Sequence, residues 1–321
     1  MLTRRAVAGF FAAVPLAAPA LAQGAWAPSR PISLVVAFPA GGGTDVAART
    51  IARFMERDLG GPVVVLNRAG AGGAIGFTEL ARAQPDGHTI GFINTPPILT
   101  IPIERRVEFS LQSFAPIANV VDDPGGLWVL PDSPHRSVAD LVAAARARPE
   151  AISYGTTGIG SDDHLAMLAL SRVANVRFLH APFAGAAPVR QNLLSRTIDV
   201  AVMNISEGLA DMRQGLMRPL AQMGERRWEK APEVPTLREL GFDVVEGSMR
   251  GMAAPAGVPP AALERLALSI RRTVENPEFQ AAAEQQGLPL RFLGPVEFAR
   301  ELGTLSAGYR ALWAAHPWRE S

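Results

Sequence analysis

The feature that most constrains the fold of this chain is a repeated passage from an apolar run through glycines into an amphipathic helix. The run "ISLVVAF" (residues 32–38) has the continuous apolar character of a buried parallel strand, and "DVAARTIARFMERDL" (residues 45–59) has apolar residues close to helical spacing. "PVVVLN", "IGFTELARA" and "TIGFIN" continue the alternation to residue 94. Strand, helix, strand, helix, strand predicts a parallel sheet connected by crossover helices.

The same alternation returns later in the chain, after two extended runs, "FAPIANVV" and "GGLWVLP", that are separated by "DDPG". "SVADLVAAARARPE" predicts a helix with Ser137 as its N-cap. "ISYGTTG" predicts a strand that ends in a second glycine loop, and "SDDHLAMLALSRV" predicts a helix capped by Ser161 or Asp162. "VRFLHAPF", "APVRQNLLSR" and "IDVAVMN" add strand, helix and strand, so we expect two α/β units.

Two amphipathic helical segments follow, "PAGVPPAALERLALSIRRTVENPEFQAAAEQQGL" and "GPVEFARELGTLSAGYRALWAA". These two segments contain little predicted β-strand, so they do not easily form a third domain. We expect them to cover the first sheet. The first lobe is then discontinuous, residues 23–122 plus 248–321, and the second lobe, residues 123–247, is inserted into it. Such a chain crosses a hinge between the lobes at least twice.

Length and composition exclude several classes of site. The 321 residues suffice for two domains with cores of their own. The chain has no cysteine, which excludes thiol catalysis, disulfides and cysteine-ligated metals. Its histidines are scattered and form no H-E-x-x-H pair, so we expect neither a metal nor a cofactor: His88, His135, His164, His180 and His316.

The first 22 residues predict an export signal. "MLTRR" is basic, "AVAGFFAAVPLAAPA" is apolar, and Ala20 and Ala22 supply the small residues read before a cut, so we expect cleavage after Ala22 and a periplasmic protein. The Arg4-Arg5 pair leaves the twin-arginine route open. Loss of both arginines changes the formal net charge from +1 to −1, which gives no electrostatic case for binding nucleic acid.

The glycine loop at residues 41–43 favours an anion. Glycines allow a tight turn and close approach of a ligand, and the first turn of a helix has free N–H donors and a partial positive charge. A P-loop would need a lysine that is missing here, and the G-x-G-x-x-G pattern fails at Val46. A small carboxylate therefore fits better than a nucleotide. "YGTTGIGSDDHL" (residues 154–165) is a loop of the same kind, and two such loops facing each other predict a cleft between lobes.

Two other interpretations stay open at this stage. The glycine loops can be tight turns without a ligand, with Asp45 stabilising the N-terminus of its helix. An exported hydrolase-like enzyme could use Asp45 or Ser161 in the same cleft, although the chain has no G-x-S-x-G elbow. Ser161, Asp163 and His164 are crowded into one segment and do not easily form a catalytic relay.

Several segments in order resemble one family: "FPAGGGTDVAAR", "NRAGAGGAIGFTELARAQPDGHT", "YGTTGIGSDDHL", "HAPFAGAAPVRQNLLSRTIDVAV", "APEVPTLRELGF" and "MAAPAGVPP". They are similar to the Bug receptors, the periplasmic substrate-binding proteins of tripartite tricarboxylate transporters. The resemblance implies an α/β type II periplasmic-binding-protein fold with two doubly wound lobes, a hinge and an interdomain cleft. It also implies a monomer that captures a small organic carboxylate or amino acid for membrane permease subunits or for a sensor kinase, without catalysis.

The resemblance also implies where the ligand is held, chiefly by backbone amides and hydroxyls. The implied contacts lie on the two glycine loops, on the loop at 70–76 and at the ends of later strands: Phe38, Ala40, Gly41, Gly42, Gly43, Thr44, Asp45, Gly73, Asn94, Thr156, Thr157, Gly158, Gly160, Ser161, Ala184, Gly185 and Asn204.

The chain departs from the family pattern at several positions of these walls. Ala184 stands in "PFAG" where the family often has a lysine, and Asn204 stands where an aspartate is usual. The tryptophan common before the final glycine-rich segment is absent from "GSMRGMAAPAG". The identity of the ligand is therefore not carried over. If a side-chain cation takes part, Arg68, beside one of the core loops, is the best candidate.

Overall fold

The first part of the chain forms the predicted parallel sheet. A computed structural model describes residues 26–318, so the export signal and its cleavage site lie outside the described residues. Strands β1 (Ile32–Val36), β2 (Val63–Asn67) and β3 (Thr89–Asn94) are parallel in the order β2-β1-β3. Helices α1 (Gly43–Leu59) and α2 (Ala74–Arg82) are their crossovers. A further helix, α3 (Pro97–Glu104), follows β3, where no helix was expected.

The second predicted α/β unit is also present. Strands β5 (Ser153–Thr156), β6 (Leu179–Pro182) and β7 (Val200–Asn204) are parallel in the order β7-β5-β6. The other elements of this unit are the strand β8 and four helices: β8 (Arg218–Gln222), α4 (Val138–Ala147), α5 (Asp162–Ala174), α6 (Ala186–Leu194) and α7 (Leu209–Arg213). Ser137 and Ser161 cap α4 and α5 through their hydroxyl groups, as expected.

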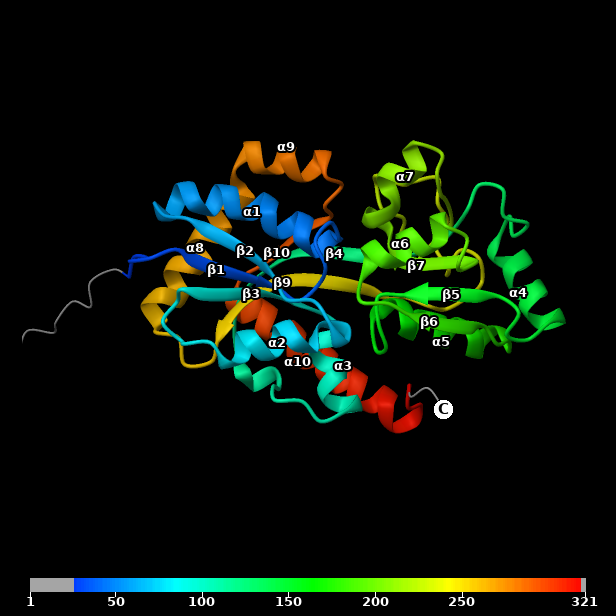
Figure 1. Cartoon of the computed structure of the whole chain (residues 1–321), viewed down its shortest axis with the longest axis horizontal. Coiled ribbons are helices and arrows are strands. Elements are labelled where there is room, and N and C mark those ends of the chain that lie inside the picture. The colour runs from blue at the N-terminus through cyan, green and yellow to red at the C-terminus, as the bar shows by residue number, and fades with distance from the viewer. Residues whose placement is uncertain (1–25, 319–321) are drawn as a thin grey trace, which may run out of the picture.

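Two long antiparallel strands join these units (Figure 1). Strand β4 (Phe114–Val129) pairs with β9 (Gly247–Pro255) along its first part and with β7 and β8 along its last part. The two runs expected to be separate on either side of "DDPG" are therefore parts of one continuous strand. Asp123 and Pro124 stay extended because they lie in register with Ser248 and Gly247 of β9.

The C-terminal elements pack against the first sheet. They are α8 (Pro260–Glu275), α9 (Pro277–Gln285), β10 (Leu290–Leu293) and α10 (Pro295–Ala315). Apolar residues of α8 and α9 share a core with α1 on one face of the sheet, and those of α10 share a core with α2 and α3 on the other face (Figure 1). We call β1–β3, β9, β10 and helices α1–α3 and α8–α10 the first lobe, and β5–β8 with α4–α7 the second lobe.

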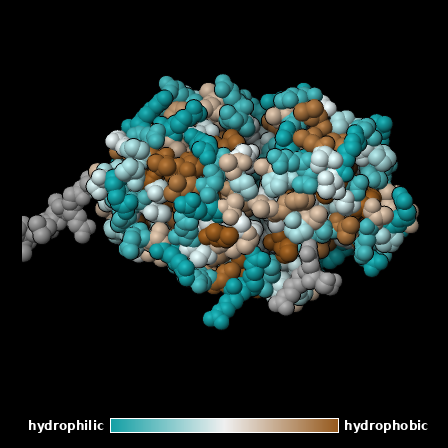
Figure 2. Space-filling view, in the orientation of Figure 1, coloured by the Kyte–Doolittle hydropathy of each residue, from teal (hydrophilic) through white to brown (hydrophobic). Residues whose placement is uncertain are grey.

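The cores of the two lobes are largely separate, and β4 and β9 connect them. The second lobe has its own clusters around Leu141, Met167 and Val189, but Leu165 of α5 packs with the core of the first lobe near Phe298 and Leu302. Side chains of the lobes meet across their boundary on the face shown in Figure 2, where apolar residues lie in separate patches among polar ones. The exact lobe boundaries at 122/123 and 247/248 stay a prediction. In the described part of the chain, no helix combines the length and apolarity needed to cross a membrane.

Candidate functional site

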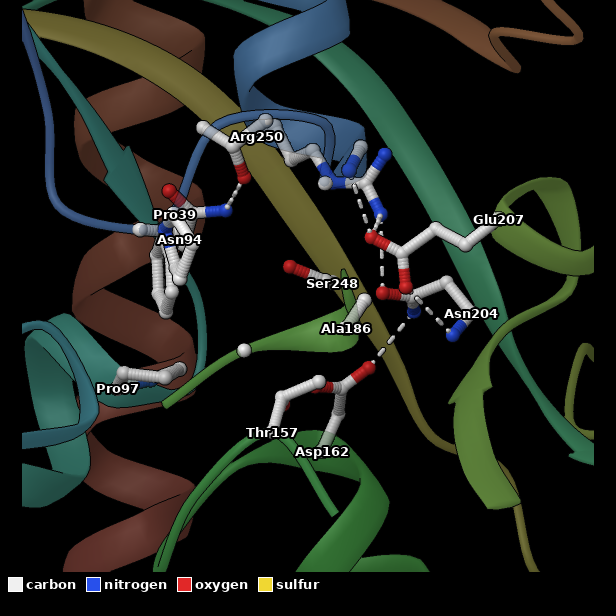
Figure 3. Close-up of a pocket in the computed structure, with 15 residues that line it drawn as sticks. Pro39, Asn94, Pro97, Thr157, Asp162, Ala186, Asn204, Glu207, Ser248 and Arg250 are labelled. Atoms are coloured by element: carbon white, nitrogen blue, oxygen red, sulfur yellow. Dashed lines mark hydrogen bonds and ion pairs between the residues drawn. The ribbon is translucent and has the colours of Figure 1, made fainter. Parts of the chain in front are cut away.

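A small cavity lies between the two lobes, and β9 forms part of its wall (Figure 3). Its volume is about 30 Å³, which is room for roughly two water molecules. The residues around it come from strand ends and helix starts of both lobes: Phe38, Pro39, Gly42, Gly43, Thr44, Asn94, Pro97, Thr157, Asp162, Gly185, Ala186, Asn204, Glu207, Ser248 and Arg250. The structure therefore has closed lobes, and a ligand of more than a few atoms requires them to move apart.

The wall from the first lobe is the glycine loop before α1. Gly41 has a φ of +83°, which suits glycine, and Gly42 is the N-cap of α1 without a side-chain cap bond. Thr44 lies inside the first turn of α1, and its hydroxyl accepts a hydrogen bond of 2.8 Å from Asn94 Nδ2. The hydroxyl hydrogen of Thr44 is left to donate at the cavity edge.

The wall from the second lobe is the loop between β5 and α5 together with the start of α6. Thr157 donates its hydroxyl to Asp163 Oδ2 at 2.6 Å, and Asp162 begins α5 at the cavity. Gly185 is the N-cap of α6 and has a φ of +140°. Ser161 is buried beneath this loop, where its Oγ accepts from the N–H of His164.

The glycine loops of the two lobes lie directly against each other. A Cβ atom placed on Gly185 would lie 2.9 Å from Pro39 Cδ, and one placed on Gly158 would lie 3.3 Å from Gly72 Cα. Thr100 Oγ1 of α3 donates to the Gly160 carbonyl at 2.7 Å. The loops can meet so closely because glycine has no side chain in the interface.

The centre of the site is a buried arginine that sequence reasoning missed. Arg250, on β9, is 1% exposed, and its Nη2 lies 2.8 Å from Asp123 Oδ2, 3.2 Å from Glu207 Oε1 and 3.0 Å from Asn204 Oδ1. Its Nη1 has no hydrogen-bond partner within the described residues. Arg68, the cation singled out from the sequence, instead forms an ion pair with Glu79 at 2.8 Å in which both side chains are exposed. The signal for Arg250 was one arginine inside the otherwise apolar strand "GSMRGMAAP".

Three carboxyl groups surround this arginine, so acids outnumber cations in the network. They belong to Asp123, Asp162 and Glu207, and Asn204 links Asp162 to the arginine by donating to Asp162 Oδ2 at 2.8 Å. Burial raises the pKa of Asp162 to about 7, assisted by the charge of Glu207 and opposed by the bond from Asn204. Burial likewise raises the pKa of Asp123 to about 6, although Arg250 opposes the shift.

Asp162 makes stability depend on pH. Its pKa in the folded state lies above the ordinary aspartate value of about 4, so between about pH 4 and pH 7 the native state binds more protons than the unfolded chain, and stability falls as pH rises. Asp162→Asn removes this effect and can still accept from Asn204. We expect the free energy of unfolding of the variant, measured with urea at pH values from 5 to 7, to rise relative to that of the parent. The difference should grow by on the order of 1 kcal/mol per pH unit.

The matched control is Asp132→Asn. Asp132 is exposed and Arg196 lowers its pKa, so Asp132 is fully ionised in this pH range. The free energy of unfolding of Asp132→Asn, plotted against pH, should therefore run parallel to that of the parent. Parallel curves for Asp162→Asn as well would contradict the raised pKa.

The predicted site residues divide into two groups. Around the cavity lie Phe38, Gly42, Gly43, Thr44, Asn94, Thr157, Gly185 and Asn204. Behind it or beside it, outside its lining, lie Ala40, Gly41, Asp45, Gly73, Thr156, Gly158, Gly160, Ser161 and Ala184. Lining residues that sequence reasoning did not name are Pro39, Pro97, Asp162, Ala186, Glu207, Ser248 and Arg250.

The two residues proposed for catalysis are held in structural contacts. Asp45 accepts from the Gly41 N–H at 3.0 Å, pairs with Arg49 and accepts from Asn67, and despite partial burial the net effect lowers its pKa. Ser161 caps α5. Burial lowers the pKa of His164 to about 3, and its ring stacks on that of His180. Among residues 26–318, no cluster of three potential ligands could hold a metal ion.

A family model describes the same chain. Residues 47–291 match the model for the tripartite tricarboxylate transporter family receptor. A protein of Pseudomonas sp. (strain P51), named "UPF0065 protein in tcbD-tcbE intergenic region", is 36% identical over 266 residues, which cover 81% of this chain and 79% of the relative. BugT of Bordetella pertussis is 32% identical over 282 residues, 87% of this chain and 86% of BugT.

Solved structures agree with the fold. The periplasmic binding protein BugD superposes with a TM-score of 0.83 at 30% identity, covering 92% of this chain and all of BugD. An R. palustris protein solved with adipate gives 0.85 at 26% identity (89% and 97% covered), and MatC of Rhodopseudomonas palustris with bound malate gives 0.82 at 25% (89% and 99% covered). Two lobes closed over a cavity between strand ends are thus the fold of periplasmic solute receptors, and this chain belongs to the Bug group of the tripartite tricarboxylate transporter receptor family.

Proposed function

We propose that this chain is exported to the periplasm, captures a small carboxylate or amino acid between its lobes, and presents it to the permease subunits of a tripartite tricarboxylate transporter or to a sensor kinase. The observation that carries the proposal is the cavity itself. It lies where β1, β3, β5 and β7 of both lobes end, which is where open parallel sheets bind ligands.

The groups around the cavity suit a small polar ligand. Thr44 and Ser248 bring hydroxyl groups to it, Gly43 brings the backbone N–H at the start of α1, and Arg250 brings a buried cation. These are the groups that bind carboxylates in proteins. The adipate and malate bound by two similar structures support the same ligand class.

A thermal-shift screen of mono-, di- and tricarboxylates, amino acids and aromatic acids tests the proposal. We expect at least one carboxylate to raise the melting temperature, to bind with a measurable heat and to be recovered unchanged after incubation. A ligand converted to product would favour the hydrolase-like alternative. No shift with any carboxylate or amino acid would contradict the proposed ligand class.

Thr44→Ala refines this test. The variant removes one hydroxyl donor at the cavity, so we expect the calorimetric affinity for the best carboxylate to fall roughly three- to tenfold, the worth of one neutral hydrogen bond. Thr304→Ala on the exposed side of α10 should leave the affinity unchanged. Loss of stability with unchanged affinity would assign Thr44 a structural role only.

A further inference from the structure

The anion site at the start of α1 is already occupied by a carboxylate of the protein itself. Glu207 projects from the turn at Ile205–Gly208 in the second lobe, and its Oε1 accepts from the Gly43 N–H of the first lobe at 3.0 Å (Figure 3). The same oxygen lies 3.2 Å from Arg250 Nη2. The other oxygen, Oε2, accepts from the Asn204 N–H at 3.2 Å.

This position is built for an anion. The helix α1 has 17 residues and its N-cap, Gly42, brings no side chain to the free N–H groups. Asp45 in the first turn points elsewhere, since its oxygens accept from Gly41, Arg49 and Asn67. Arg250 adds a buried cation whose Nη1 has no partner in the described chain and would lie 2.6 Å from a Cβ atom on Gly43. A helix N-terminus and a guanidinium at one point favour a carboxylate.

We propose that Glu207 is an internal substitute for a ligand carboxylate: it holds the lobes closed when no ligand is bound and gives up the anion site to the carboxylate of the ligand. This proposal rests on the proposed function. The cavity of about 30 Å³ cannot admit a malate-sized molecule, so the lobes must part first, and parting them breaks the bond between Gly43 and Glu207. A carboxylate that enters can then make the same two contacts.

The charges of the site favour exchange of the Glu207 carboxylate for a ligand carboxylate over addition of a ligand carboxylate beside it. The closed network already places Asp123, Asp162 and Glu207 around one arginine. Adding a ligand carboxylate while Glu207 stays would bring a further negative charge into a buried site without a further cation, which is costly. Replacing the Glu207 carboxylate by one carboxylate of the ligand keeps the number of charges in contact with Arg250 the same.

The exchange has a consequence for affinity. A ligand that competes with a closed, self-occupied state has an apparent association constant equal to the intrinsic one multiplied by the fraction of molecules that are open. A variant that weakens the self-occupied state without touching the ligand-bound state therefore binds the ligand more tightly. This outcome is the opposite of what is expected for a residue that contacts the ligand.

Glu207→Gln tests the proposal, with Glu233→Gln as the control, because Glu233 is an exposed glutamate of the same lobe. Small-angle scattering without ligand should give a larger radius of gyration for Glu207→Gln than for the parent and the control. The loss of a charged contact should reduce the closed-to-open ratio about tenfold. Calorimetry with malate should show binding up to about tenfold tighter than that of the parent.

Either of two results would overturn the proposal. An unchanged radius for the ligand-free, folded variant means that Glu207 does not hold the lobes, and weaker malate binding means that Glu207 belongs to the ligand-bound state. Glu207→Asp, whose shorter side chain retains the charge, repeats the scattering test if the glutamine variant fails to fold. Failure of the proposed function gives a different pattern of results. In that case the parent binds no carboxylate, but the radius of gyration of ligand-free Glu207→Gln is still larger than that of the parent.

Discussion

Replacing Arg250 with glutamine is expected to lower the free energy of unfolding by about 3–5 kcal/mol, the usual cost of removing one partner of a buried ion pair. Asp123 is 0% exposed and lies 2.8 Å from Arg250, so the variant leaves its carboxylate in the protein interior without a cation. Urea unfolding at pH 7 measures the loss. Because protonation of Asp123 relieves the unpaired charge, the loss should be smaller at pH 5, below its pKa of about 6.

A neighbouring ion pair supplies the matched control. Arg291 pairs with Asp122 at 2.6 Å, and both side chains are partly exposed, so Arg291→Gln should cost no more than about 1 kcal/mol. Adding Asp123→Asn to the Arg250→Gln variant removes the uncompensated charge and should recover part of the stability. Equal costs for Arg250→Gln and Arg291→Gln would show that the buried network does not stabilise the fold.

The sequence pattern predicted most of the secondary structure because each element is locally consistent. The apolar runs at β1 and β2 are followed by loops and the amphipathic helices α1 and α2, and Ser137 and Ser161 are N-caps, so local chemistry and tertiary packing agree. The continuous strand β4 was missed because "DDPG" is a strong turn signal on its own. Its extended shape depends on pairing with β9, more than 100 residues later, which no local pattern contains.

The chemistry of the site was harder to predict than its loops. Gly43, Thr44 and Gly185 follow strand ends, where a glycine or hydroxyl residue is a recognisable signal. Arg250 and Glu207 lie 43 positions apart, on a strand and a short turn, and meet only when β9 passes from one lobe toward the other. An isolated arginine and an isolated glutamate are ordinary surface residues in a sequence, so their burial as a pair becomes visible only in the fold.

A disulfide between positions 100 and 160 is expected to abolish ligand binding in its oxidised form. Thr100 lies on α3 of the first lobe and Gly160 on the loop before α5 of the second, and a Cβ atom on Gly160 would lie 3.3 Å from Thr100 Cβ. This separation is close to the 3.5–4.5 Å that disulfides require. The chain has no cysteine of its own, so Thr100→Cys with Gly160→Cys gives one defined crosslink. Locked lobes leave a cavity of about 30 Å³, and a carboxylate identified by the thermal-shift screen should bind at least 100-fold more weakly by calorimetry.

The reducing agent provides the control within the same molecule. Dithiothreitol breaks the crosslink and should restore binding, whereas each single-cysteine variant should bind in either condition. Gly160 has a φ of +73°, so a cysteine there strains the backbone by about 1–2 kcal/mol, and this cost is present in both redox states and cannot imitate a redox-dependent loss. If the oxidised protein still binds the carboxylate normally, the ligand enters without separation of the lobes. The cavity at Arg250 is then not the binding site, and binding does not displace Glu207.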